Sequence, residues 1–279
     1  MQPCKRTGNA GSMAACNAKE VLMQKLNTLR SLGDIRGYEL GALDGEIGKC
    51  KDFLFEDKNW TIRYMVADTR KWLPGRKVLV SPISIGKADA GTRTLSVSLT
   101  KDQIKQSPPL DEDAPVSRQY EQAFNVHYQL MPYWGGTGLW GMHAHPGHLM
   151  PGGEAIPQQD PVEGVEDVEA SNLRSTGEVT GYTIQAQDSD IGHIEDFIVD
   201  LDIWTIRYLI IDTSNWLPGS KRVMIAPAWA DLVDWKRRSV VVNLTSDQIK
   251  DSPEFDPSAP INRELEERVY DYFGRPYYW

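Results

Sequence analysis

Apolar positions fill both faces of two short stretches of the chain, residues 61–67 and 205–211. Both stretches are rich in β-branched and aromatic residues, which favour strands. Because successive side chains of a strand point to opposite faces, Ile62 and Tyr64 share one face. The other face is polar at Arg63 and apolar beyond it. A strand with two apolar faces is covered on both sides, so we predict two buried central strands. The residues that we expect to be covered behind the arginines are Met65, Ala67, Leu209 and Ile211.

The motifs around these two strands recur at a constant spacing. Trp-Thr-Ile-Arg-Tyr, Asp-Thr and Trp-Leu-Pro-Gly occur twice in the same order, 144 residues apart (60 to 204 and 72 to 216). Self-similarity at a fixed distance indicates a duplicated structural unit. The Pro-Gly dipeptide of each copy predicts a tight turn, and an apolar run follows it. We therefore predict a β-hairpin at the centre of each copy.

Further elements flank both hairpins. We predict strands at 37–43, 47–56 and 94–99 in the first copy, and at 182–187, 191–201 and 239–244 in the second. Thr-x-x-Gln at Thr100 and at Thr245 is a capping-box pattern, which predicts a short helix. Longer helices are predicted at 117–128 and 262–273, each followed by an aromatic tail that we expect to lie across its own unit. The segments 83–91 and 228–236 are predicted to be irregular.

These motifs together resemble the PRC-barrel family. The resemblance is carried by Asp44-Gly45-Glu46-Ile47-Gly48, Asp52-Phe53, the Trp-Thr-Ile-Arg-Tyr strand and the Trp-Leu-Pro-Gly turn, and it covers 37–134 and 181–279. The family is named for the cytoplasmic domain of the photosynthetic reaction centre H subunit, and a related barrel forms the C-terminal half of a ribosome maturation factor. The resemblance implies a mainly β protein with two tandem small β-barrels, each followed by a short helix and a C-terminal helix.

The expected organisation has four parts. Residues 1–33 form a disordered tail apart from a short helix within 18–32, and residues 34–134 form the first PRC-barrel domain. Residues 135–176 are rich in glycine, proline and acidic residues, as flexible linkers are. Residues 177–279 form the second PRC-barrel domain. The sequence leaves open whether the two domains dock.

Composition restricts the function and the compartment. The net charge of −9 argues against general nucleic-acid binding, which needs a basic surface. No apolar run is long enough to span a membrane, so no transmembrane segment is expected. The cysteines Cys4, Cys16 and Cys50 are an odd, unrepeated set, which predicts no disulfide framework and a cytoplasmic location. Cys50 lies on a predicted strand and is expected in the core.

Candidate chemistry is sparse. His143, His145 and His148 form a short histidine tract, and such tracts can bind metal. A held zinc site needs a fourth ligand, and none stands beside them, so we favour a tract without metal. The paired carboxylates Asp44 and Glu46 could bind a cation, but turn formation by Asp-Gly explains them. We expect no enzyme activity and no cofactor.

Four residues are candidates for partner binding. Trp72 and Trp216 each precede an expected Pro-Gly turn, where a tryptophan can be a contact hot spot, although each could instead pack on its own unit. Arg63 and Arg207 interrupt otherwise apolar strands. They either face a partner or form internal ion pairs, for which Asp52 or Asp68 and the equivalent Asp196 or Asp212 are the expected carboxylates. We favour the ion pairs.

The sequence therefore predicts a non-enzymatic module that binds a protein partner as an adaptor or scaffold. The resemblance implies this, because the barrel of the H subunit packs on a membrane complex and that of the maturation factor contacts a ribosomal protein. One alternative is a ribosome or RNA-processing factor, although the separate N-terminal domain of the maturation factor is not recognised. Another is a photosynthetic protein similar to the H subunit, although the membrane helix of that subunit is not recognised. The identity of the partner and homo-oligomer formation are left open.

Overall fold

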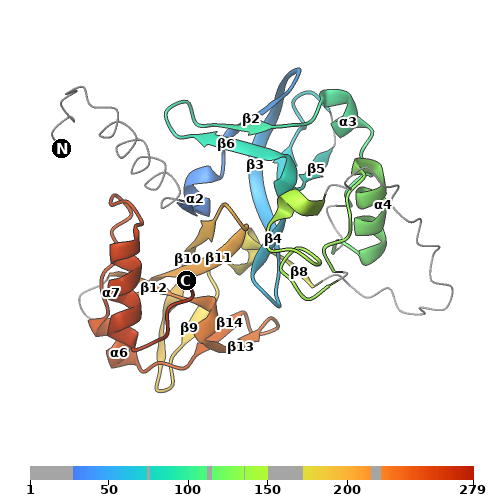
Figure 1. Ribbon diagram of the computed structural model, residues 1–279. Helices are drawn as coiled ribbons and strands as arrows, with labels where there is room; N and C mark the ends of the chain where they lie inside the picture. Colours follow the sequence, from blue (N-terminus) through green and yellow to red (C-terminus); the bar gives the residue numbers. More distant parts are fainter. Residues whose placement is uncertain (1–27, 74–75, 112–114, 135, 150–171, 215–220) are drawn as a thin grey trace, which may run out of the picture.

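Strands dominate the part of the chain that the computed structural model describes, residues 28–73, 76–111, 115–134, 136–149, 172–214 and 221–279. These strands belong to one mixed sheet of 14 strands (Figure 1). The prediction of a mainly β protein is confirmed. The described strands do not close into two separate barrels, because β6 and β13 remain as the two ends of the sheet path.

Each copy of the repeat contributes six strands in the same order. The strands of the first copy are β2 (Glu39–Ala42), β3 (Gly45–Glu56), β4 (Thr61–Asp68), β5 (Lys77–Val80), β6 (Ile85–Asp89) and β7 (Thr94–Val97). Those of the second copy are β9 (Thr183–Gln185), β10 (Asp190–Asp200), β11 (Thr205–Asp212), β12 (Arg222–Ile225), β13 (Ala230–Asp234) and β14 (Ser239–Val242). The pairs β2–β7 and β9–β14 are parallel, and the other pairs within each copy are antiparallel.

Strands β6 and β13 replace the irregular segments that the sequence predicted at 83–91 and 228–236. Their pairing with β7 and β14 contains a register shift, between Ile85 and Ala88 in the first copy and between Ala230 and Leu232 in the second. An extra residue in a ladder interrupts the alternation of apolar and polar positions. That alternation is the signal by which a strand is recognised in a sequence, so the prediction was wrong there.

The central strands β4 and β11 are buried on both faces, as predicted. Met65, Ala67, Leu209 and Ile211 each have an exposed fraction of 0%. Cys50 also lies in the core, where burial raises the pKa of its thiol to about 12. The thiol therefore stays protonated at neutral pH and packs as a small apolar group.

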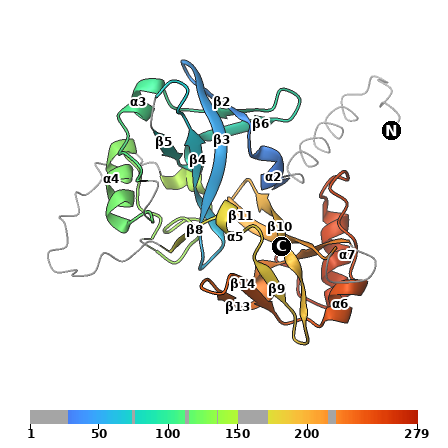
Figure 2. The same ribbon diagram turned by 180° about the vertical axis from the view of Figure 1, so that it is seen from behind.

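The four helices predicted within the two copies, two short and two long, are present. Helices α3 (Lys101–Lys105) and α6 (Ser246–Asp251) each begin with the predicted capping box at Thr100 and Thr245. The longer helices are α4 (Arg118–Tyr128) and α7 (Arg263–Phe273), and they lie at opposite sides of the molecule (Figures 1 and 2). Short 3-10 turns are η1 (Pro82–Ser84), η2 (Pro146–Leu149) and η3 (Pro227–Trp229).

The two copies are joined by a reciprocal exchange of short elements. Strand β1 (Leu29–Ser31) precedes the first copy but pairs antiparallel with β10 of the second copy. Strand β8 (Leu173–Ser175) precedes the second copy but pairs antiparallel with β3 of the first. Helices α2 (Leu32–Ile35) and α5 (Thr176–Val179) continue from these strands and lie against β10 and β3 respectively.

This exchange changes the expected organisation of the chain. Residues 29–31 were assigned to a helix within the tail 1–33, and residues 173–175 to the flexible linker 135–176. Both segments are strands, because each completes a sheet edge that belongs to the other copy. An edge strand with unpaired backbone groups readily accepts a further strand. Residues 1–27 of the predicted tail and residues 150–171 of the predicted linker lie outside the described residues.

The two copies also meet directly at the centre of the sheet. Strand β4 pairs antiparallel with β11 at Thr61 and Thr205, which are equivalent residues of the repeat. The amide of Ile62 donates to the carbonyl of Trp204 at 2.7 Å, and the amide of Ile206 donates to that of Trp60 at 2.8 Å. Each contact has its mirror in the other copy, so a pseudo-twofold axis passes between the two threonines. The two copies share one apolar core and form a single body.

Gly48 and Gly41 offer a matched test of how closely β3 packs against the end of β4 in the first copy. Gly48 has φ of +120°, and an added Cβ would lie 2.0 Å from the carbonyl oxygen of Asp68. Gly41 lies on the neighbouring strand β2, where an added Cβ meets nothing within 4 Å. We predict that Gly48→Ala lowers the free energy of unfolding by at least about 2 kcal/mol, because backbone strain and the clash combine. Gly41→Ala should change it by less than about 0.5 kcal/mol, as open surface positions do. Urea denaturation measures both, and equal stabilities of the two variants would contradict the predicted close approach.

Candidate functional site

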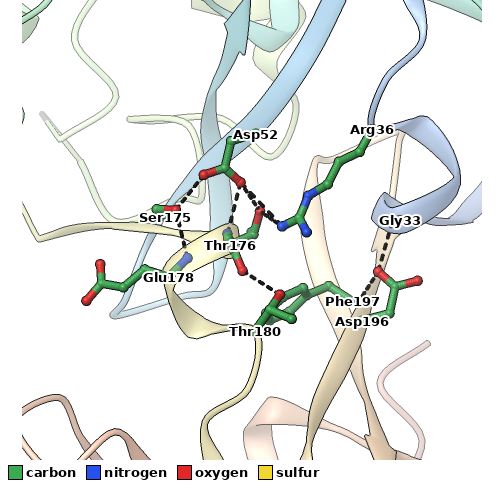
Figure 3. A network of polar contacts seen from close by, with 10 residues as sticks. Gly33, Arg36, Asp52, Ser175, Thr176, Glu178, Thr180, Asp196 and Phe197 are labelled. Atoms are coloured by element: carbon green, nitrogen blue, oxygen red, sulfur yellow. Dashed lines mark hydrogen bonds and ion pairs between the residues drawn. The ribbon is translucent and has the colours of Figure 1, made fainter. Parts of the chain in front are cut away.

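A polar network holds the exchanged element α5 against the first copy (Figure 3). The carboxylate of Asp52 on β3 accepts hydrogen bonds from the Ser175 hydroxyl at 2.5 Å, the Thr176 hydroxyl at 2.8 Å and the Gly177 amide at 2.9 Å. Ser175 also caps α5, because its oxygen accepts from the amide of Glu178. Arg36, the C-cap residue of α2, reaches across and donates to Thr176 at 2.7 Å, so both exchanged elements are tied together.

The equivalent network holds α2 against the second copy. The carboxylate of Asp196 on β10 accepts from the Ser31 hydroxyl, from the Gly33 amide at 2.9 Å and from the Phe197 amide at 2.7 Å. Burial raises the pKa of Asp196, and these hydrogen bonds act in the opposite direction. Such a set of partners positions a backbone segment. The role of this network is therefore docking of the two copies.

The docking role of these residues was not predicted from the sequence, although the sequence contains a signal for it. Leu-Arg-Ser occurs at 29–31 and again at 173–175, at the same spacing of 144 residues as the central strands. Each tripeptide is followed by glycine two residues later and by Gly-Tyr further on. Extending the repeat backwards by eight residues would have placed both exchanged strands inside the duplicated unit.

A second duplicated arrangement surrounds the two strand arginines, and we call it the arginine–aromatic cluster. Cluster 1 consists of Arg63, Tyr64, Arg118, Glu121, Tyr133 and Trp134, and cluster 2 of Arg207, Tyr208, Arg263, Glu266, Tyr278 and Trp279. In each cluster one arginine comes from the central strand and one from the long helix. The aromatic tail that follows the helix supplies the two rings. The tails therefore lie across their own units, as predicted.

A buried glutamate stands at the centre of each cluster. Glu121 accepts hydrogen bonds from Tyr133 at 2.7 Å and from Tyr64 at 3.2 Å, and forms an ion pair with Arg118 at 2.9 Å. Glu266 likewise accepts from Tyr208 and Tyr278, at 2.7 and 2.6 Å. Burial raises the pKa of Tyr64 and of Tyr133 well above the usual tyrosine value, so both remain hydroxyl donors. A buried carboxylate that is paired and hydrogen-bonded in this way stabilises one packing arrangement.

The guanidinium groups stack on the aromatic tails. Arg63 lies 3.9 Å from the ring centre of Tyr133, and Arg207 lies 3.9 Å from that of Tyr278. Arg118 and Arg263 lie 4.2 and 3.9 Å from the rings of Trp134 and Trp279. Each such contact contributes about 0.5–1 kcal/mol at an exposed site and more when it is desolvated.

The two clusters differ in what covers them. The segment 136–149 folds back over cluster 1, where Arg63 donates to the carbonyl of Leu139 at 2.5 Å and lies 4.7 Å from the ring of Trp140. The indole of Trp140 donates to the carbonyl of Ile203 in the second copy at 2.8 Å. As a result the side chain of Arg63 is 2% exposed, whereas that of Arg207 is 22% exposed.

The partner-binding candidates Arg63 and Arg207 therefore form internal contacts. Arg63 forms an ion pair with Glu56, and Arg207 forms one with Asp200 at 3.5 Å. The expected carboxylates, Asp52 or Asp68 and their equivalents, are wrong. Glu56 stands opposite Thr61 in the ladder and so lies diagonally beside Arg63 on one face, which makes it the nearer carboxylate.

Of the two tryptophan candidates, Trp72 packs on its own unit. The indole of Trp72 donates to the carbonyl of Ile47 at 2.7 Å, and the ring is half-buried beneath Lys101 at 5.6 Å. This ties the turn after β4 to its own unit. Trp216 lies outside the described residues.

The histidine tract and the paired carboxylates occupy separate places. The rings of His143 and His148 stack 4.7 Å apart, while His145 lies within hydrogen-bonding distance of the Asp202 carbonyl, at 3.3 Å. Within the described ranges, no three histidine, cysteine or acidic side chains gather as metal ligands would. Asp44 accepts from the backbone amide of Lys101 at 2.8 Å, so it caps helix α3 as well as forming its turn.

Comparison with known proteins gives no assignment, because no protein-family model and no curated protein matches the chain. Among the described helices, none is long and apolar enough to cross a membrane.

The central glutamate of cluster 1 predicts a specific pH dependence. Burial raises the pKa of Glu121, although Arg118 and the two tyrosines act in the opposite direction. Between the ordinary value of about 4.3 and the raised value, the folded protein binds a proton that the unfolded chain has released. The contribution of this residue to stability therefore falls as the pH rises through that interval. In Glu121→Gln this dependence should disappear.

The measurement is urea denaturation of both proteins from pH 4 to pH 7. The wild-type protein should lose stability relative to Glu121→Gln as the pH rises. Glu267→Gln, at an exposed position of helix α7, controls for the change in net charge. Stability curves that run parallel at every pH would exclude a raised pKa for Glu121.

Proposed function

We propose that the chain is a non-enzymatic scaffold, built from two PRC-barrel-type units, that binds a protein partner. The observation that carries the proposal is the group of exposed aromatic side chains at the end of the second copy. Tyr272, Tyr277 and Trp279 are 40%, 45% and 43% exposed, and Tyr277 stacks on Trp279 at 4.6 Å. Tyrosine, tryptophan and arginine are the residues that most often dominate protein interfaces.

The rigidity of the aromatic group supports this proposal. The guanidinium of Arg263 lies under Trp279, and the hydroxyl of Tyr277 donates to Asp271 at 2.5 Å. Aromatic side chains that are already held in place lose little conformational entropy when a partner binds. The docking of the two copies lowers the entropic cost of binding further, because a partner would meet a single preformed body.

The net charge and the described contacts favour a protein over nucleic acid as the partner. With 39 acidic and 30 basic residues, the chain lacks the overall positive charge that phosphate binding needs. The described arginines beside the exposed aromatics are already stacked or paired. They present planar, partly desolvated faces, which suit contact with a protein surface.

The proposal is tested by separating a native lysate on a density gradient and following the full-length protein with an antibody. We expect the wild-type protein to migrate in an assembly heavier than the purified chain. Replacing the two stacked aromatics of this group, Tyr277→Ala with Trp279→Ala, should return it to the position of the purified chain. Leu43→Ala is the matched control, because Leu43 is 70% exposed but lies on the first copy.

The position of the assembly distinguishes the alternatives. Migration with ribosomal subunits identifies a ribosome or RNA-processing factor, and migration with membranes identifies a partner like that of the H subunit. The scaffold proposal would be overturned if the wild-type protein migrates only at the position of the purified chain and the double variant migrates at that same position.

A further inference from the structure

Cluster 1 shows how one arginine–aromatic face is filled. Residues 138–143 form a small hairpin, in which the amide of Gly138 donates to the carbonyl of Gly141 and the amide of Trp140 to that of His143. An added Cβ on Gly138 would lie 2.6 Å from the His143 carbonyl, so the hairpin closes tightly. The hairpin presents a carbonyl oxygen to Arg63 and an indole ring to the same guanidinium.

The indole of this hairpin also bridges the two copies. Trp140 is 1% exposed and donates to the carbonyl of Ile203, in the turn between β10 and β11. The site that Trp140 occupies therefore has three parts: the strand arginine, the aromatic tail of the first copy, and a turn carbonyl of the second. Burial of a tryptophan ring that is also hydrogen-bonded makes this an anchor for the segment.

The pseudo-twofold axis generates the same three parts on the other side of the molecule. Arg207 and Tyr278 replace Arg63 and Tyr133, and the carbonyl of Asn59 replaces that of Ile203. Asn59 and the neighbouring Lys58 are exposed, in contrast to Ile203. The carbonyl of Asn59 accepts the Thr61 hydroxyl at 3.4 Å and keeps a second lone pair, so the parts of a second tryptophan site are present.

The described contacts of Arg207 leave this second face open. Its guanidinium makes an ion pair with Asp200 and stacks on Tyr278, and within the described ranges it makes no hydrogen bond to a carbonyl like that of Leu139. In cluster 1 the hairpin covers the guanidinium of Arg63, whereas the side chain of Arg207 is 22% exposed. An arginine that already stacks on one ring can accept a second ring on its opposite face.

We propose that this face, formed by Arg207, Tyr278 and the turn at Asn59, binds a tryptophan-bearing segment of a partner protein. The segment would resemble Gly-Leu-Trp-Gly in chemistry, with a carbonyl for Arg207 and an indole between Arg207 and the turn. The proposal rests on the scaffold function and names the chemistry of the partner segment. It differs from the exposed group of Tyr277 and Trp279, which provides the surrounding contact surface.

The test uses the full-length protein and a fluorescein-labelled peptide with the sequence of residues 136–143, GTGLWGMH. Fluorescence anisotropy should show saturable binding below about 1 mM peptide, which corresponds to about 4 kcal/mol of binding free energy. Arg207→Gln should weaken binding at least tenfold, about 1.4 kcal/mol. Arg222→Gln, at an exposed arginine paired with Glu195, should leave binding unchanged. A peptide with alanine in place of tryptophan should not bind.

A photo-crosslinking measurement locates the peptide independently of any variant. A peptide with benzoylphenylalanine in place of tryptophan should form adducts with Tyr278 or with the turn around Asn59. Adducts confined to cluster 1, or binding that is lost in Arg63→Gln and kept in Arg207→Gln, would show exchange with the internal hairpin and overturn the proposal.

Other occupants give different results, each of which overturns the proposal. A dimer of the purified chain that is lost in Arg207→Gln identifies a second copy of this protein. Peptide binding that requires removal of residues 1–27 identifies an occupant from the same chain. No binding at any peptide concentration, together with an assembly that depends on Tyr277 and Trp279, rejects the tryptophan segment while leaving the scaffold function in place.

Discussion

The reciprocal pairing between the two copies is the constraint on which the rest of the structure depends. The amides of Ile62 and Ile206 bond across the pseudo-twofold axis, and β1 and β8 each complete a sheet in the opposite copy. Asp52 and Asp196 fix the helices that follow those strands. Because these contacts occur in equivalent pairs, the relative position of the two copies is specified at several points at once. The hairpin at 138–143 bridges the copies only because the turn at Ile203 is held beside Arg63.

The duplication explains why a structural cluster can also be a binding surface. Each cluster has a buried glutamate, two arginines and an aromatic tail, and this inner part stabilises its own unit. The outer face of the strand arginine is not needed for that purpose. In the first copy a segment of the same chain covers the outer face, and in the second copy the equivalent face is partly exposed. Of the two otherwise equivalent clusters, cluster 2 is therefore the one whose strand arginine has an exposed part that a partner could contact.

Local signals in the sequence predicted the parts of the fold that depend on neighbouring residues. The central strands, both capping boxes and helices α4 and α7 follow from apolar periodicity and N-cap residues, which act within a few positions. Strands β1 and β8 are three residues long, and only a partner strand in the other copy, far away in the sequence, makes them strands. A window along the sequence contains no information about that partner. Comparing the two copies does contain it, through the repeated Leu-Arg-Ser.

The candidate site was predicted only in part, for a related reason. Arg63 and Arg207 stood out because a charged residue interrupts an apolar strand, and the ion-pair interpretation was correct in kind. The carboxylate was misassigned because ladder register, rather than distance in sequence, selects Glu56 and Asp200. Trp140 was missed because it lies in a glycine-rich segment whose composition is typical of a flexible linker. Its burial results from the docking of the two copies, which the sequence left open.

The exchange of β1 and β8 also has a consequence for synthesis of the chain. Asp52 meets Ser175, which is 123 residues further along, and Ser31 meets Asp196 across 165 residues. The first copy therefore leaves the ribosome with one edge of β3 uncovered, and it stays so until β8 has been made. Strand β1 in turn waits for β10. Contacts between such distant residues form slowly, and uncovered strand edges invite wrong pairing in the meantime. A nascent chain that stops after the first copy would expose the parts of β3 and β4 that the second half of the chain covers in the finished protein.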